Sequence, residues 1–385
     1  MTDLSWAQVS ARRLARHRLT TPTPDTTPDV DRLADVVSVL CGAHAQVASA
    51  AELSVGLRAP GATRALVRQA LWRDRTLVKT RGPRGTVHLL AAADLPMWTG
   101  ALSAMPTPPR ERSVALLTPR QTERVLAAIA EALAEAELTT AELTEEVVAR
   151  TGEWAGERVM EAFQDRWPRW FAAMGQATRS GIVCFGPNRG RATTYTSPNR
   201  WLPGFTPMAG RAALADLVRR YLYAYGPATP AQFAQWLSAP RPWATWLFTL
   251  LDLTEVTVEG TPAWVAADDT DFPDDPPSGL RLLPYFDAYV VGCHPRDRLY
   301  PGAAAERALA GGQAGNYPVL LVDGTVAGVW HQRRSGRTIR VTVEPLRALD
   351  ARRRRELAEE IERVGHILEG DATLTVGTVR VGPHA

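Results

Sequence analysis

The sequence predicts an α+β fold with three tandem winged-helix domains followed by a C-terminal β-barrel-like domain. Helical periodicity gives way to a short β-hairpin three times along the chain, which is the order of a helix-turn-helix and its wing. The C-terminal part is instead rich in alternating strand patterns. A length of 385 residues also exceeds one typical core and suggests two to four domains.

The first predicted domain, residues 1–115, contains three helices and one hairpin. A Pro/Thr-rich stretch, 20–28, is expected to be a loop, and Asp29 or Asp31 is expected to cap the helix after it. Two alternating segments then flank a Gly/Pro turn that carries Arg81 and Arg84, which is typical of a hairpin. The expected helices are 5–19, 29–40 and 63–73, and the expected strands are 76–80 and 86–90.

The second predicted domain, residues 116–206, begins with an Ala/Glu/Leu-rich helix that ends near Leu138. Thr139, with an acidic residue three positions later, predicts the start of a second helix. A Trp-rich stretch is expected to continue the helical part. The domain ends in a hairpin whose Gly/Pro/Asn turn, 186–191, is again basic.

The third predicted domain, residues 207–278, repeats this plan on a smaller scale. Thr229 followed by Pro230 is a strong start signal for the helix at 231–237. A helix over 213–225 is expected before it, and a hairpin of 253–259 and 263–266 after it.

The fourth predicted domain, residues 279–385, is β-rich. Its alternating segments predict a small closed or half-closed β domain with one long helix. The expected strands are 282–287, 318–322, 326–331, 338–343 and 372–381, and the expected helix is 344–367.

Charge alone says little about partners, because the formal net charge is only +3. Lys79 is the only lysine, so 43 of the 44 basic residues are arginine. Codon usage in a GC-rich genome explains this bias, and explains the abundant Ala, Gly and Pro as well. Arginine suits phosphate and base contacts, but only its placement in the chain argues for nucleic-acid binding.

Targeting signals and metal sites are not indicated. No apolar run approaches the roughly 20 residues that span a bilayer, and the first residues lack the regions of a secretory signal. Cys41, Cys184 and Cys293 lie far apart without zinc-ligand spacing, and their odd number argues against a disulfide framework. A cytoplasmic protein without membrane contact, metal or organic cofactor is predicted.

The most informative segment is 41–47, where the polar residues His44 and Gln46 interrupt small apolar ones. On a regular helix, residues two apart point to different sides. The helix must therefore break if both side chains serve one site, and Gly42 permits such a break. The alternative is that the two side chains only satisfy the backbone of a buried loop.

The segment resembles the catalytic motif of the winged-helix DNA glycosylases typified by AlkZ, with YcaQ-type relatives. Their pattern is Gln-x-Gln or Gln-x-Asp with an apolar x, followed about a dozen residues later by Arg. His44-Ala45-Gln46 and Arg58 fit this frame, except that His44 replaces the usual Gln. Further resembling stretches extend the likeness over nearly the whole chain: 84–89, 283–287, 322–324 and 328–330. The family fold agrees with the four predicted domains.

The resemblance implies hydrolysis of the N-glycosidic bond of purines alkylated at N7 or N3. Such a purine is cationic and leaves as a neutral base, so the enzyme needs mainly to aim water at an oxocarbenium-like sugar. Histidine ordinarily titrates near pH 6.5 and can take a proton from that water. We expect His44 to activate the water and Gln46 to position the water or the sugar. Lys79 looks structural, which favours a monofunctional hydrolase over a Schiff-base lyase.

The expected DNA contacts are arginines in turns. The predicted hairpin around residues 330–338 concentrates basic side chains at its tip, where they can grip phosphates or enter a groove. An ordinary solvated turn is the alternative. The candidate DNA-binding residues are Arg58, Arg81, Arg84, Arg296, Arg298, Gln332, Arg333, Arg334 and Arg337.

The expected partner is double-stranded DNA that contains alkylated purines, bound by a monomer. Bulky adducts or interstrand crosslinks left by genotoxic natural products are the substrates that the resemblance suggests, with a role in self-resistance. Two alternatives stay open. One is a non-catalytic transcription regulator, although many of those bind palindromes as dimers. The other is a damage-binding protein in which His44 marks lost activity.

Overall fold

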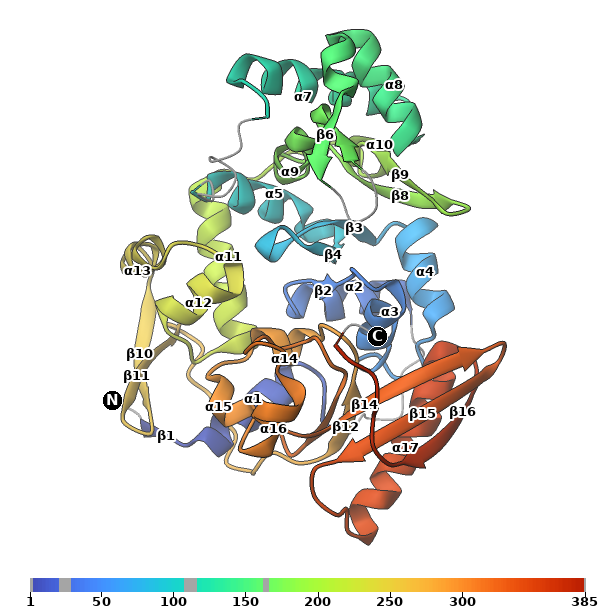
Figure 1. Ribbon diagram of the computed structural model, residues 1–385. Coiled ribbons are helices and arrows are strands. Elements are labelled where there is room, and N and C mark those ends of the chain that lie inside the picture. Colours follow the sequence, from blue (N-terminus) through green and yellow to red (C-terminus); the bar gives the residue numbers. More distant parts are fainter. Residues whose placement is uncertain (1–2, 21–28, 107–115, 162–165, 384–385) are drawn as a thin grey trace. The chain divides into compact units, whose positions relative to one another are not determined.

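The computed structural model describes residues 3–20, 29–106, 116–161 and 166–383, and the chain divides into two compact units (Figure 1). Unit 1 consists of Met1–Asp74 together with Val218–Ala385, and unit 2 consists of Arg75–Leu217. This division is coarser than the four predicted domains, which stay a prediction. The predicted loop at 20–28 falls, apart from Thr20, outside the described residues.

The N-terminal part of unit 1 is helical, as the periodicity predicted. Side chains of Ser5, Asp29 and Thr63 accept hydrogen bonds from backbone N–H groups of the first turn and so fix where three of its helices begin. Asp29 is thus the cap rather than Asp31. The helices are α1 (Trp6–Arg16), α2 (Val30–Val39), α3 (Ala48–Gly56) and α4 (Arg64–Trp72).

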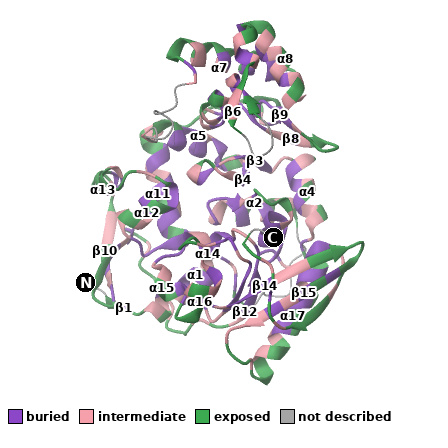
Figure 2. Ribbon diagram, in the orientation of Figure 1, coloured by how far each residue is buried: buried purple, intermediate pink, exposed green. Residues whose placement is uncertain are grey.

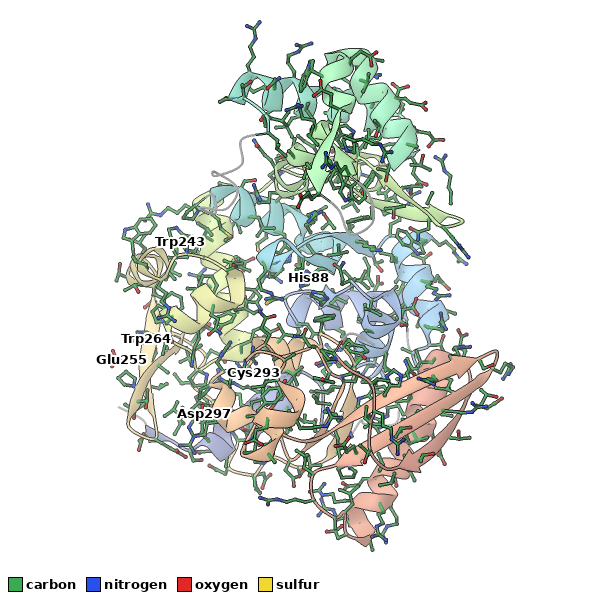
Figure 3. The ribbon with its side chains drawn as sticks, viewed as in Figure 1. His88, Trp243, Glu255, Trp264, Cys293 and Asp297 are labelled. Atoms are coloured by element: carbon green, nitrogen blue, oxygen red, sulfur yellow. The ribbon has the colours of Figure 1, made fainter. Side chains whose placement is uncertain are left out.

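The third predicted hairpin is confirmed and lies in unit 1. Its strands pair in antiparallel register, so that Glu255 lies opposite Trp264 (Figure 3). The short strand β1 pairs in parallel with the first strand of the hairpin, β10, and Leu4 contributes to a small core with it. The elements are β1 (Asp3–Leu4), α11 (Gly210–Tyr225, which crosses the boundary between the units), α12 (Pro230–Leu237), α13 (Arg241–Thr249), β10 (Leu253–Val258) and β11 (Thr261–Ala266).

The C-terminal part of unit 1 is a curled sheet in the order β12-β13-β14-β15-β16, with α17 packed against it (Figure 1). The last strand, β16, runs parallel to β15, and the others are antiparallel. Three short helices lie between the first two strands. The elements are β12 (Leu280–Leu283), α14 (Ala288–Gly292), α15 (Arg296–Leu299), α16 (Ala303–Ala308), β13 (Val319–Val322), β14 (Thr325–Ser335), β15 (Thr338–Pro345), α17 (Ala351–Leu368) and β16 (Asp371–Val376).

Several boundaries of the C-terminal part differ from the prediction. The first strand ends at Leu283 rather than at Asp287, because Phe286 has a φ of 55° and Asp287 caps α14. The strand expected at 326–331 continues to Ser335. The helix begins at Ala351 rather than near Glu344, because β15 continues through Pro345 and Asp350 caps the helix by accepting from the Arg353 N–H. The last strand ends at Val376 rather than at Val381. The errors at the first strand, the helix and the last strand come from extending a pattern past its true end.

Unit 2 contains the first two predicted hairpins. Around the second hairpin, α7 and α8 build a core in which Trp170 is fully buried. The expected N-terminal cap at Thr139 is confirmed, because Thr139 and Glu142 form a reciprocal capping box. The elements are β3 (Leu77–Arg81), β4 (Val87–Ala91), α5 (Leu95–Ala104), α7 (Pro119–Ala134), β5 (Leu138–Thr139), α8 (Thr140–Thr151), α9 (Met174–Arg179), β8 (Cys184–Arg189), β9 (Ala192–Thr196) and α10 (Pro198–Trp201).

The Trp-rich stretch of unit 2 is not a continuous helix. Gly152, at φ 113°, ends α8, and two 3-10 turns and the small hairpin of β6 (Arg158–Glu161) and β7 (Arg166–Pro168) follow. Trp167 stacks on Phe171 with ring centres 4.4 Å apart. The tryptophans of this stretch therefore indicate side-chain packing and do not predict a helix.

The mixed α+β class and all three hairpins are confirmed, whereas the assignment of three winged helices stays a prediction. Within the described ranges, no helix has the length and apolar character needed to cross a membrane.

Candidate active site

Helical structure is interrupted between α2 and α3, in the segment that carries His44 and Gln46. Cys41 and Gly42 have φ values of 53° and 98°, in the left-handed region that a helix cannot contain. The two-residue strand β2 (Ala43–His44) follows, and α3 begins after the extended residue Val47. The predicted helix break at Gly42 is therefore confirmed.

His44 and Gln46 lie in the non-helical segment between α2 and α3. Only Ala43 and His44 form extended strand, and the chain bends at Gln46. Ala43 and Ala45 are buried, whereas His44 is partly exposed and Gln46 is exposed. The His44 Nδ1 atom is itself buried, so solvent reaches Gln46 and only part of the His44 ring.

The ring of Phe286 covers one face of the His44 imidazole. The two ring centres lie 4.5 Å apart and the ring planes differ by 29°, which is a stacked arrangement. Phe286 follows the end of β12 and has a φ of 55°. Its backbone N–H donates to the carbonyl oxygen of Gly315 at 2.9 Å. The half-buried Phe286 thus forms a wall beside the predicted catalytic histidine.

The residue after Phe286 is the centre of a buried polar network. The Asp287 carboxylate accepts hydrogen bonds from the Arg58 guanidinium at 2.7 and 2.8 Å and from the Ser54 hydroxyl at 2.6 Å. It also accepts from the Tyr289 N–H at 3.0 Å and thereby caps α14. Neither side chain of the Arg58–Asp287 pair is exposed to solvent. The network ties α3 to the turn that presents Phe286.

Charges in this network are set by burial and pairing together. Burial on its own raises the pKa of Asp287, but the Arg58 guanidinium and the hydrogen bonds from Arg58 and Ser54 outweigh it and leave that pKa below its usual value. Nearby, burial and then the Arg58 charge lower the pKa of His17 to about 3. His17 packs edge-on against Tyr225 and Tyr289, so it is a neutral core residue.

Two of the arginines expected to contact DNA are instead bonded to protein acceptors, Arg58 in the interior and Arg296 at a partly buried position. The Arg58 guanidinium is fully buried in its ion pair with Asp287. Arg296 donates to the carbonyl oxygens of Val290, Val291 and Cys293, and so closes the C-terminal end of α14. In each case the guanidinium faces protein acceptors, which does not suit direct contact with DNA.

Three other predicted DNA-binding arginines remain at the surface. Arg298 is exposed and pairs with Glu259 at 2.7 Å. In the β3–β4 turn, Arg81 donates to the Gly85 carbonyl at 3.1 Å, and Arg84 has a φ of 60°. Both are partly exposed, so their contact with DNA stays a prediction.

The β14–β15 hairpin exists as predicted, and its tip is exposed (Figure 2). Arg333 and Arg337 lie at this tip, and Arg337 is 3.8 Å from Asp371. Arg334 instead donates to the backbone carbonyls of Leu368 and Glu369, at the end of α17. Gln332 is partly buried further down β14. Of the four candidates, Arg333 and Arg337 are the best placed for phosphates.

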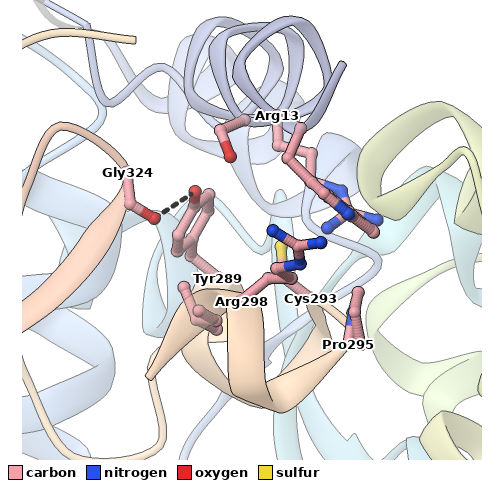
Figure 4. A pocket seen from close by; sticks show the side chains of 9 residues that line it. Arg13, Tyr289, Cys293, Pro295, Arg298 and Gly324 are labelled. Carbon is pink, nitrogen blue, oxygen red and sulfur yellow. Dashed lines mark hydrogen bonds between the residues drawn. The ribbon is translucent and has the colours of Figure 1, made fainter. Parts of the chain in front are cut away.

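A small pocket in unit 1 lies beside α14, away from His44 in sequence (Figure 4). Arg13, Tyr289 and Cys293 are among its lining residues, and the Tyr289 hydroxyl donates to the Gly324 carbonyl at 3.0 Å. Burial raises the pKa of Cys293 to about 11, so the thiol stays protonated. The pocket has room for about one water molecule and is therefore too small for a nucleobase.

Three contributors to the site were missed by sequence reasoning: Phe286, Asp287 and Ser54. Phe286 and Asp287 belong to the stretch 283–287 that carried part of the family resemblance, but no role was inferred for them. The available signal was an acidic residue at the end of the apolar segment 282–287. Ser54 gave none, because it lies in an apolar helix.

Residues 37–367 match the family described as AlkZ-like DNA glycosylases. A relative from Streptomyces sahachiroi, named interstrand DNA cross-link repair glycosylase, is 33% identical over 340 residues, which make up 85% of this chain and 87% of that protein. The solved structure of Streptomyces sahachiroi DNA glycosylase AlkZ is 28% identical, with a TM-score of 0.80, and the likeness covers 98% of this chain and 100% of that one.

Proposed function

Because the chain belongs to the AlkZ-like family of DNA glycosylases, we propose that it hydrolyses the N-glycosidic bond of purines alkylated at N7 or N3. Membership confirms the resemblance found in the sequence and identifies the chain as a DNA glycosylase. A transcription regulator is accordingly no longer the leading alternative. The alkylated purine, the hydrolytic mechanism and the roles of individual residues are our proposal.

One observation supports the assignment of the proposed activity to His44 and Gln46. His44 is partly exposed and Gln46 is exposed two residues further on in the same non-helical segment, and the His44 ring is stacked on Phe286. A base and a hydrogen-bonding amide so arranged can hold one water molecule between them. This supports an active-site role over the alternative in which both side chains merely satisfy a buried loop.

The proposed reaction is a direct attack of water on the sugar. The water oxygen forms a bond to the anomeric carbon, and the glycosidic electron pair passes to the purine and neutralises its positive charge. His44 takes the proton that the water loses, and the Gln46 carboxamide oxygen accepts the other water hydrogen. The products are a neutral alkylpurine and an abasic site.

Bulky adducts and interstrand crosslinks are the substrates that we favour. The relative from Streptomyces sahachiroi is named for cross-link repair, and it matches this chain along most of both lengths. A role in self-resistance to a DNA-alkylating natural product would follow from such a substrate. The monomeric state and the cytoplasmic location stay predictions.

Release of 7-methylguanine from a defined duplex tests the proposal. Wild type, His44→Ala and Gln46→Ala are compared under single-turnover conditions with enzyme in excess. Removal of a general base typically costs about 10²- to 10⁴-fold in rate, so we expect His44→Ala to show a loss of that order. His366→Ala, a change to an exposed histidine on α17, is the matched control and should keep the wild-type rate.

The outcomes separate the alternatives. Full excision by His44→Ala would remove His44 from the chemistry. If wild type releases no 7-methylguanine, a duplex with a bulky N7-guanine adduct is the next substrate. Binding of both duplexes without release from either would instead identify a damage-binding protein.

A further inference from the structure

We propose that Phe286 is a positioning residue, whose ring holds the His44 imidazole in the orientation that water activation requires. The inference rests on the proposed function in one respect, namely that His44 acts on the attacking water. It goes further by assigning a role to a residue 242 positions away in the sequence, and to the polar network that fixes it.

Stacking of Phe286 on His44 is compatible with the action of the imidazole as a general base. An imidazole forms hydrogen bonds through its nitrogens, in the plane of the ring. A phenyl ring over one face restricts rotation about the Cβ–Cγ bond, yet it leaves those in-plane directions open. With the centres 4.5 Å apart and the planes at 29°, Phe286 covers the His44 face in this manner.

Phe286 itself is held in an unfavourable backbone conformation. A bulky residue at φ 55° is uncommon, and such a conformation persists only where the surroundings enforce it. On one side, the Phe286 N–H is bound by the Gly315 carbonyl. Gly315 has a φ of 92°, and a Cβ built there would lie 3.1 Å from both Cα and Cδ1 of Phe286. The turn at Gly315 is therefore fitted closely to Phe286.

On the other side, Phe286 is tied to α3 through Asp287. Asp287 is bound by Ser54 and Arg58, which lie on α3 and directly after it. The segment that carries His44 leads directly into the same helix. The His44 and Phe286 rings are thus both attached to α3, so their relative placement is fixed within unit 1. Strain combined with such support clusters at functional sites.

The test compares Phe286→Leu with Phe286→Tyr. Leucine keeps bulk but removes the ring, whereas tyrosine keeps the ring. The matched control is Phe272→Leu, since Phe272 is also a half-buried phenylalanine of unit 1 but packs on Arg12. Each variant is measured for single-turnover release of the base, for DNA affinity and for the NMR signals of the His44 ring protons, assigned by their loss in His44→Gln.

We expect Phe286→Leu to slow the single-turnover step by about 10- to 100-fold, the usual cost of a misplaced catalytic group, with unchanged DNA affinity. Phe286→Tyr and Phe272→Leu should keep the rate. The His44 ring protons should lose their upfield ring-current shift only in Phe286→Leu. A role in folding alone would not give this separation of rate from affinity.

Two results would overturn the inference. One is excision by Phe286→Leu at the wild-type rate, and the other is a His44 spectrum that does not change in that variant. If wild type excises no base at all, the proposed function fails, and the His44 spectrum alone then decides whether Phe286 positions the ring.

Discussion

Arg58 and Asp287 lie 229 residues apart in the sequence and form two hydrogen bonds, of 2.7 and 2.8 Å, with no exposed surface on either side chain. Ser54 adds a third bond to the same carboxylate. Removal of one partner from a buried ion pair is strongly destabilising, because the remaining charge stays out of water without compensation. The pair is therefore a sensitive point of unit 1.

Loss of one partner should destabilise unit 1 strongly. Arg58→Met leaves the Asp287 charge buried without its partner, and we expect the free energy of unfolding to fall by about 3–5 kcal/mol. Urea denaturation at pH 7 measures this. Arg58→Met combined with Asp287→Asn removes both charges and should recover part of the loss. Equal stability of the single and double variants would contradict this account of the pair.

Acid should destabilise the protein before its carboxylates titrate. Burial lowers the pKa values of His17 and His294 to about 3, whereas histidine in the unfolded chain titrates near 6.5. The unfolded state therefore binds more protons than the folded state between these values, and stability falls as the pH drops below about 6.5. Each histidine contributes a loss of about 2 kcal/mol between pH 7 and pH 5.

His17→Gln provides the test of this acid sensitivity, since a glutamine amide can still donate to the Ala224 carbonyl that His17 contacts. Unfolding free energies at pH 7 and pH 5 should differ less in the variant than in wild type. An equal difference in both proteins would show that His17 does not titrate on unfolding in this range.

Lys79 should be dispensable for base release. Its Nζ lies over the Phe185 ring at 5.2 Å, and burial lowers its pKa. We expect Lys79→Met to release 7-methylguanine at the wild-type rate. Borohydride added during the reaction should trap no covalent adduct between wild type and DNA, because a hydrolase forms no Schiff base. A trapped adduct that disappears in Lys79→Met would instead establish a lyase.

Arg333 and Arg337 should contribute to DNA affinity through phosphate contacts. Replacing either by glutamine is expected to reduce the slope of log K against log salt concentration by about 0.9, measured by anisotropy on undamaged duplex. Arg352→Gln is the control, since Arg352 is also exposed but lies on α17, outside the hairpin, and pairs with Glu356 at 2.9 Å. A slope unchanged in both hairpin variants would show that the tip is only a solvated turn.

Features governed by neighbouring residues were predictable from the sequence. The caps at Thr139 and Thr229 depend on backbone groups at most three residues away, and both are confirmed. The cap expected at Asp29 or Asp31 is at Asp29. The break at Gly42 is equally local. By contrast, the short helices α14, α15 and α16 span only four to six residues each, too few for periodicity to show. The helix α13 was hidden by aromatic residues and prolines, which are weak helix formers.

Only the part of the candidate site that lies close together in the sequence was predictable. The spacing of His44 and Gln46 and the break before them lie within six residues of chain. Phe286, which stacks on His44, is brought there by tertiary folding, and no pattern near position 44 points to it. Arg58 illustrates the same limit, because an arginine carries no local sign of whether its partner is a phosphate or a buried carboxylate.

The discontinuity of unit 1 also dictates when an active protein can exist during translation. The ribosome delivers His44 and Gln46 early, then all of unit 2, and only afterwards Phe286 and Asp287. A nascent chain that stalls within unit 2 therefore carries His44 and Gln46 without Phe286, the ring that stacks on His44. Contacts between residues so far apart in the sequence form slowly. The contact between His44 and Phe286 can therefore form only late, after the C-terminal part has been synthesised.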